Sequence, residues 1–150
     1  MKTRVVRNRV KTCVIGYVVD RLFGPDGRLK FHRIIRNTIP AVGLAWMAKC
    51  IAGEAHNAIS HVAVGTGTPG ATALGAEAAR VAVDSVTRSG AGVTVTATFG
   101  PGVATGTLTE AGIFDAGAAG TMIASQSFAA TPKGAADTLV RNWTITHAAA

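Results

Sequence analysis

The sequence has few of the residues that redox or aromatic-lined binding sites use. Aromatic residues make up 5% of its 150 residues, charged residues make up 15%, and only two residues are cysteines. Cys13 and Cys50 both lie in apolar stretches, which favours two buried thiols. A disulfide between them is the alternative, although nothing in the sequence requires an oxidising compartment.

Long hydrophobic runs are also missing. The apolar run 12–19 is short and ends at Asp20, so we expect no signal peptide. The run 39–53 is short and broken by Lys49, so we expect no membrane span. Both observations predict synthesis in a reducing cytoplasm.

Small and turn-forming residues are abundant instead. Hydrophobic residues make up 48% of the chain and glycine accounts for 18 positions, which suits tight turns. Residues 93–99 read V-T-V-T-A-T-F, so apolar side chains alternate with threonines. Alternation with a period of two is typical of a half-buried strand. Similar patterns separated by glycine turns continue to His147 and predict a mainly β protein.

The predicted fold is an antiparallel, jelly-roll-like β-sandwich with one packed helix and a basic N-terminal arm and hairpin. We divide the chain into 1–36, the arm and hairpin, and 37–150, the helix and sandwich body. Residues 74–79 could form one helical turn. Strands are predicted over 13–22, 28–36, 59–64, 80–88, 93–99, 104–114, 121–128 and 138–146.

One helix is predicted between residues 37 and 53. Asn37 or Thr38 would cap its start, with Pro40 near the first turn, and Gly53 would end it. Four residues share one apolar face, which we expect to pack on a sheet. They are Leu44, Met47, Ala48 and Ile51.

The net charge of +7 is concentrated in the first third of the chain. Residues 1–50 hold eleven basic and two acidic residues, giving +9, whereas residues 51–150 hold four basic and six acidic residues, giving −2. Such a segment predicts an acidic partner. Direct nucleic-acid binding is the alternative, although no helix-turn-helix, RNP or zinc pattern is present. The predicted partner-binding residues are Arg4, Arg7, Arg9, Arg21, Arg28, Lys30, Arg33 and Arg36.

Candidate chemical sites are weak. The glycines at 65, 67 and 70 fit G-x-G-x-x-G, but Pro69 breaks the run where a phosphate-binding helix should begin. The four histidines are scattered, so we expect no metal site. Glu77 and Glu110 stand in apolar stretches, where they could serve as an acid–base pair. We favour structural contacts with Arg80, Lys133 or Arg141, and predict no catalytic residue and no cofactor.

Several motifs follow one another in a defined order after residue 36. N-T-I at 37–39, followed by G-L at 43–44, resembles the helix entry N-L-I-T-N-A-G-L. I-S-H-V-A-V-G-T-G-T at 59–68 resembles I-x-x-I-A-V-G-T-G-T, and L-G-A-E-A-A-R at 74–80 resembles L-x-x-E-x-x-R. L-T-E-A-G-I-F-D at 108–115 resembles I-T-E-A-G-L-F-D. The order continues through Met122, Phe128, Lys133, Asp137 and Trp143. Together these motifs resemble a family of short structural proteins of tailed phages.

The resemblance covers about three quarters of the chain and implies a non-catalytic component of the virion. We expect an oligomeric capsid decoration or cement-type protein that binds neighbouring virion proteins. A tail, baseplate or fibre-associated role is the alternative. Residues 1–36 fit the family pattern least well, so their predicted anchoring role rests on their charge.

Overall fold

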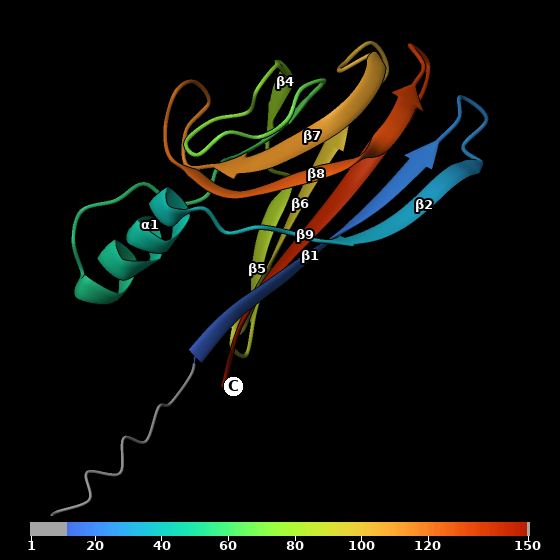
Figure 1. Ribbon diagram of the computed structural model, residues 1–150. Coiled ribbons are helices and arrows are strands. Elements are labelled where there is room, and N and C mark those ends of the chain that lie inside the picture. Colours follow the sequence, from blue (N-terminus) through green and yellow to red (C-terminus); the bar gives the residue numbers. More distant parts are fainter. Residues whose placement is uncertain (1–11, 150) are drawn as a thin grey trace, which may run out of the picture.

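The computed structural model describes residues 12–149, which form nine strands and one helix (Figure 1). The elements are β1 (Thr12–Phe23), β2 (Leu29–Arg36), α1 (Ala41–Ala52), β3 (His61–Gly65), β4 (Glu77–Ala82), β5 (Ser85–Ser89), β6 (Gly92–Phe99), β7 (Gly106–Phe114), β8 (Met122–Lys133) and β9 (Thr138–Ala149).

The strands form two antiparallel sheets that pack face to face, which confirms the predicted sandwich with one helix. One sheet has five strands in the order β2-β1-β9-β6-β5, and the other has four in the order β4-β3-β7-β8. Four successive hairpins, β1–β2, β3–β4, β5–β6 and β7–β8, each stay within one sheet. The chain changes sheets after each of these hairpins, and β9 returns to the five-stranded sheet.

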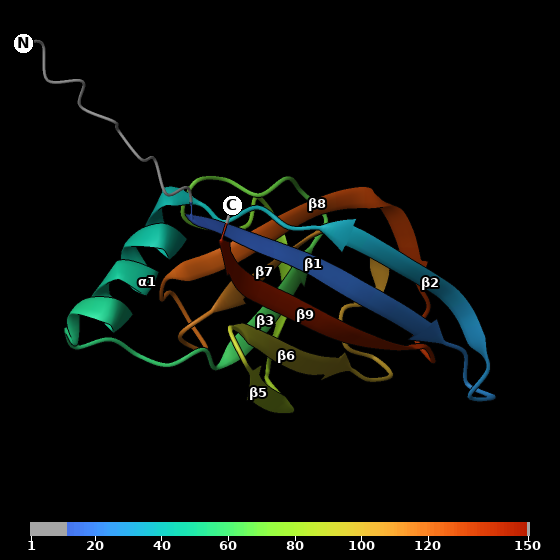
Figure 2. The same cartoon turned by 90° about the horizontal axis from the view of Figure 1, so that it is seen from below.

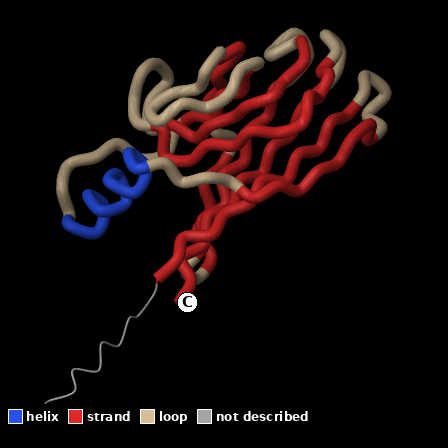
Figure 3. Tube along the Cα trace, in the orientation of Figure 1, coloured by secondary structure: helices blue, strands red, loops and turns tan. Residues whose placement is uncertain are grey.

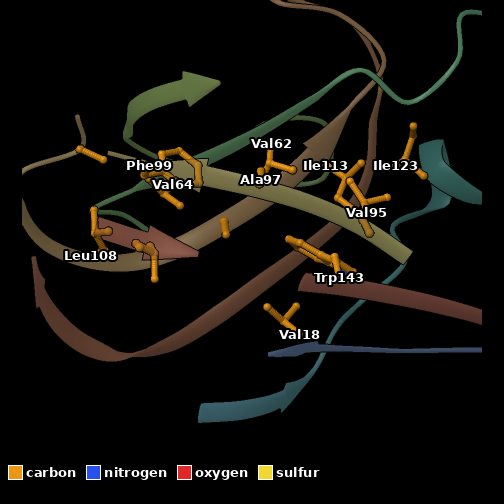
Figure 4. Close-up of a cluster of buried hydrophobic side chains, with 14 of the residues drawn as sticks. Val18, Val62, Val64, Val95, Ala97, Phe99, Leu108, Ile113, Ile123 and Trp143 are labelled. Atoms are coloured by element: carbon orange, nitrogen blue, oxygen red, sulfur yellow. The ribbon is translucent and has the colours of Figure 1, made fainter. Parts of the chain in front are cut away.

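The core lies between the two sheets and is built from small aliphatic residues around a few large ones. Trp143 of β9 pairs in register with Val18 of β1 and Val95 of β6, and all three are fully buried. Val62, Val64 and Ile113 of the facing sheet belong to the same cluster (Figure 4). Alternation along each strand therefore directs one set of side chains inward, as the sequence pattern predicts.

Strand β1 lies inside the five-stranded sheet, between β2 and β9. Its pairing with β9 runs from Thr12 to Phe23, and both hairpin strands lie along the sandwich (Figure 2). The predicted boundary at residue 36 therefore does not separate two structural units. The sequence suggested a separate hairpin because it shows which strands are adjacent along the chain, but not that β9 returns to pair with β1.

Helix α1 packs on β8 through a different face from the one predicted. Gly43 and Met47 are buried, whereas Leu44 and Ile51 are exposed. A Cβ at residue 43 would overlap the carbonyl oxygen of Ile123, so glycine allows the helix to lie against the strand. Pro40, which has no side-chain acceptor, occupies the N-cap position, so neither Asn37 nor Thr38 caps the helix as predicted; the backbone of Thr38 pairs with that of Ser125. Gly53 ends it in the left-handed conformation, as predicted.

Three smaller predictions are also wrong. The expected helical turn at 74–79 is replaced by bends that lead into β4, and the expected strand 80–88 is divided between β4 and β5. The chain changes sheets at Val83 and Asp84: the Val83 amide donates to the carbonyl of Ser60, just before β3, and the Asp84 amide donates to that of Thr96 in β6. β8 also continues through Lys133, beyond the predicted end at residue 128. Figure 3 shows the resulting distribution of strand and loop.

Candidate interaction surface

The five-stranded sheet presents one face to the core and a second face, here called the outer face, away from it. Residues that pair across neighbouring strands form rows that cross the sheet, and alternate rows lie on the outer face. One row runs Arg36, Tyr17, Thr144, Thr94 and Thr87, from β2 to β5. The next row runs Ile34, Val19, Asn142, Thr96 and Ser85. A third contains His32, Arg21, Val140 and Thr98.

The outer face has two halves of different chemistry. Over β1 and β2 it combines apolar and basic side chains: Ile34 is 63% exposed, Tyr17 43% and Ile15 42%. Arg21, His32 and Arg36 lie exposed among them. Over β9, β6 and β5 the face is dominated by threonine and serine hydroxyls, with Thr94 and Thr144 oxygens 3.3 Å apart. An apolar centre with a basic border is typical of a protein-binding surface.

The positive charge on this face is not neutralised within the described part of the chain. Neither Arg21 nor Arg36 forms an ion pair with another described residue, and the rows contain no carboxylate. Arg28 lies off the face in the β1–β2 turn, where it is highly exposed and 3.7 Å from Asp26. Arg4, Arg7 and Arg9 lie outside the described residues. The predicted basic anchor is therefore represented on the outer face by Arg21 and Arg36.

Arg33 has a different role from the predicted one. It stands in the inward row Arg33, Asp20, Arg141 across β2, β1 and β9. Its Nη2 lies 2.5 Å from Asp20 Oδ2, and its Nη1 donates to Thr131 Oγ1 at 2.7 Å. Its guanidinium also lies 4.0 Å from the centre of the Phe128 ring. Because alternation points it inward, Arg33 stabilises the fold instead of presenting charge to a partner.

The Asp20–Arg141 pair is completely buried. Arg141 Nε donates to Asp20 Oδ1 at 2.6 Å, and Arg141 Nη2 donates to Oδ2 at 2.7 Å. Burial alone would raise the pKa of Asp20, but the charges and hydrogen bonds of Arg141 and Arg33 outweigh it and hold the pKa below its usual value. Asp20 therefore remains an anion between two cations.

Lys30 and Lys133 also serve the fold, through Asp137. Lys30 Nζ donates to the two carboxylate oxygens of Asp137 at 3.0 and 2.8 Å. Buried Lys133 donates to the backbone carbonyls of Gly100 at 2.9 Å and Asp137 at 2.7 Å. Burial lowers the pKa of Lys133, although nearby Asp137 opposes that effect. Lys133 therefore contacts backbone oxygens and not Glu110, the carboxylate considered as its partner.

Glu110 organises the glycine-rich loop after β3. Its Oε1 accepts hydrogen bonds from the amides of Gly67 at 3.0 Å and Ala76 at 2.6 Å, and its Oε2 accepts one from Gly75 at 2.8 Å. The carboxylate is fully buried. These amides resemble those that a phosphate-binding loop offers to an anion, but here an internal carboxylate occupies them. The G-x-G-x-x-G match is therefore a structural loop, as favoured from the sequence.

Glu77 and Arg80 form the second contact expected from the sequence motifs. Arg80 Nη2 lies 2.7 Å from Glu77 Oε2, and Arg80 Nη1 donates to the carbonyls of Ala116 and Ala119. The guanidinium carbon lies 3.7 Å from the centre of the Phe114 ring. The pair therefore holds the loop after β7 against the outer side of the four-stranded sheet.

Other chemical sites are not found in residues 12–149. No group of three or more histidine, cysteine or acidic side chains in this range could hold a metal ion. Cys13 and Cys50 are both free thiols. No helix in the same range has the length and hydropathy needed to cross a membrane.

The apolar centre of the outer face was not predicted from the sequence. Ile15, Tyr17 and Val19 alternate with Val14, Gly16 and Val18, so both sides of β1 are apolar or small. Alternation shows that these two sets face opposite ways, but it does not show which set faces the core. The basic residues on neighbouring β2 were the one signal that could have marked the exposed side.

No protein-family model matches this chain, and no curated protein or solved structure matches it.

Proposed function

We propose that this chain is a non-catalytic structural protein of a tailed-phage virion, most simply an oligomeric capsid decoration or cement-type protein. It is made in the host cytoplasm and assembles onto the particle. The outer face over β1 and β2 docks on an acidic surface of a neighbouring virion protein. Binding to the assembled particle and not to its free subunits would stabilise the particle by mass action.

The outer face is the observation that carries this proposal. It combines exposed Tyr17 and Ile34 with Arg21 and Arg36, which have no ion-pair partner among the described residues. An acidic protein surface would neutralise the arginines, and its apolar side chains would cover the isoleucine and tyrosine. A second copy of the same face is disfavoured, because like charges would meet.

The sequence motifs support the proposal in a second way. Three motifs of the phage family meet at Glu110, which joins G-T-G-T at 65–68 to L-G-A-E at 74–77. The carboxylate of Glu110 therefore has a structural role, and no substrate is needed to explain its presence. This use of carboxylates suits a protein that assembles.

Mass spectrometry of purified particles tests the proposal directly. We expect the chain in the particles, with a copy number in the hundreds for a shell protein. A copy number that is a small multiple would instead favour a location in the tail, baseplate or fibre, and absence from the particles would overturn the proposal.

Particles lacking the chain can then be tested for rebinding of the purified chain. Arg21→Glu with Arg36→Glu should abolish rebinding, whereas the control Arg28→Glu, which lies off the face, should retain it.

Nucleic-acid binding is the second candidate, because the unpaired arginines could also meet phosphates. A gel-shift titration over a range of salt concentrations separates the two. Binding of the outer face to a virion protein, which includes apolar contacts, should persist at moderate salt. Affinity of the purified chain for DNA that falls steeply with salt would instead favour the nucleic-acid candidate.

A further inference from the structure

Apart from Lys49, helix α1 is apolar around its circumference, although only one side of it is covered. Lys49 is its single charged residue. Gly43 and Met47 are buried against β8, while Ile51 is 86% exposed and Leu44 49% exposed. The helix lies at one end of the sandwich, with one side turned away from both sheets (Figures 1 and 2). A helix that is hydrophobic all round is normally buried on all sides, so this one lacks a partner.

The exposed side carries a regular pattern, here called the α1 stripe, made of Ala41, Leu44, Ala48 and Ile51. All four are exposed, and their spacing of three, four and three residues places them along one seam of the helix. This spacing is the one by which paired helices interlock. Small and large side chains alternate along the stripe, and none of the four has a charge or a hydrogen-bonding group.

We propose that the α1 stripe binds the α1 stripe of a second copy of this chain, with the two helices antiparallel across a twofold axis. In that arrangement Ala41 faces Ile51 of the second copy, and Leu44 faces its Ala48. Twofold symmetry repeats both contacts, so each large side chain meets a small one. A parallel arrangement would place alanine on alanine and leave gaps beside the leucines.

The absence of charge along the stripe also favours a second copy as the occupant. The stripe is uncharged, so two stripes meet without repulsion or an unpaired buried charge. The outer face is a poor alternative occupant, because Arg21 and Arg36 would lose water without gaining a partner. Antiparallel helices also place the positive end of each helix dipole beside the negative end of the other.

This inference deepens the proposed function, since it names the surface by which the proposed oligomer forms. It is nevertheless tested without particles. Sedimentation equilibrium of the purified full chain should show a dimer. Ile51→Lys should raise the dissociation constant of the dimer by about a hundredfold or more, because twofold symmetry removes two buried isoleucines, each contributing about 1.5–3 kcal/mol. Lysine is tolerated in the last turn of a helix, so the monomer should still fold.

The matched control is Ile34→Lys, which charges an exposed isoleucine on the outer face and should leave the dimer unchanged. A wild-type monomer at all concentrations would overturn the inference, as would equal effects of the two variants. Circular dichroism and thermal melting verify that each variant is folded. A dimer in solution with no chain in the particles would refute only the proposed function. A monomer in solution with the chain present in the particles would refute only the dimer.

Disulfide trapping tests the antiparallel orientation. In a background in which Cys13 and Cys50 are replaced by alanine, copies with Leu44→Cys are mixed with copies with Ala48→Cys and oxidised. We expect mainly mixed dimers, because residues 44 and 48 face each other across the twofold axis. Predominant linkage of residue 44 to residue 44 would overturn the antiparallel arrangement.

Discussion

Arg141 Nε lies 2.6 Å from Asp20 Oδ1, and neither side chain has any exposed surface. The two residues are 121 positions apart in the sequence and adjacent in register on β9 and β1. Arg33 contacts the same carboxylate from β2. One buried anion therefore joins the three strands next to the proposed docking surface, and two cations depend on it.

Asp20→Asn should be the most damaging substitution in this group. It removes the negative charge and leaves two guanidinium groups without a counter-charge. Breaking a buried pair in this way costs about 3–5 kcal/mol of the free energy of unfolding. Arg141→Met should cost less, because the Asp20–Arg33 pair remains. Urea denaturation measures both, and Arg28→Met is the exposed control. Equal losses for all three would show that the buried cluster contributes little.

Glu110→Gln should loosen the glycine loop. The remaining amide oxygen can still accept the hydrogen bonds from Gly67 and Ala76, but the NH2 group that replaces the other oxygen cannot accept the one from Gly75 and places two donors against each other. Hydrogen bonds to a buried charged group contribute about 1.5–3 kcal/mol, so we expect a loss of about that size. Hydrogen exchange should show faster exchange at these three amides.

Glu77→Gln is the matched control for that loop, since its carboxylate is partly exposed and pairs with Arg80. It should change the free energy of unfolding by about 1 kcal/mol or less and leave the loop amides protected. Protected amides in Glu110→Gln would contradict the role assigned to Glu110.

Gly43→Ala should destabilise the protein even though alanine favours a helix. Propensity alone predicts a gain of about 1 kcal/mol. The added methyl group would overlap the Ile123 carbonyl, so α1 must move away from β8 at a cost of about 1–3 kcal/mol. Thermal unfolding distinguishes the two effects, with exposed Ala45→Ser as the control. A higher midpoint for Gly43→Ala would show that the close helix–strand contact is absent.

Acid should weaken the fold through Asp20 and Asp137. Hydrogen bonds from Lys30 and from the Gly134 amide hold the pKa of Asp137 below its usual value. The pKa of Asp20 is lowered by its two arginines, against the effect of burial. Groups with a lowered folded-state pKa stabilise the protein above their unfolded pKa, near 4, and lose that contribution as the pH falls. The midpoint of urea denaturation should therefore decrease between about pH 5 and pH 2.

Two variants check the source of this acid sensitivity. Asp137→Asn should be less stable at neutral pH and should lose less stability on acidification, because one of the two titrating groups is gone. Asp26→Asn removes an exposed carboxylate and should keep the wild-type pH dependence. If the denaturation midpoint of Asp137→Asn falls with pH as steeply as that of the wild type, the Asp137 contacts do not contribute to the acid sensitivity.

The sequence by itself determined the class of fold and much of the polar framework. Alternation at 93–99 predicted β6, glycine turns predicted the hairpins, and Gly53 marked the end of α1. Structural contacts were expected for Glu77 and Glu110. These features depend on local backbone preference or on burial of one face of one strand, which neighbouring residues largely decide.

Only the tertiary structure decided which side chains face outward. Arg21 and Arg33 are both arginines on adjacent strands, yet β9 pairs with β1 so that Arg33 points to buried Asp20 and Arg21 points away from the core. The same holds for α1. Gly43 and not Leu44 faces β8, because only a residue without a Cβ fits against the Ile123 carbonyl. Periodicity divides side chains into two faces, but contacts between residues far apart in the sequence choose the face that is buried.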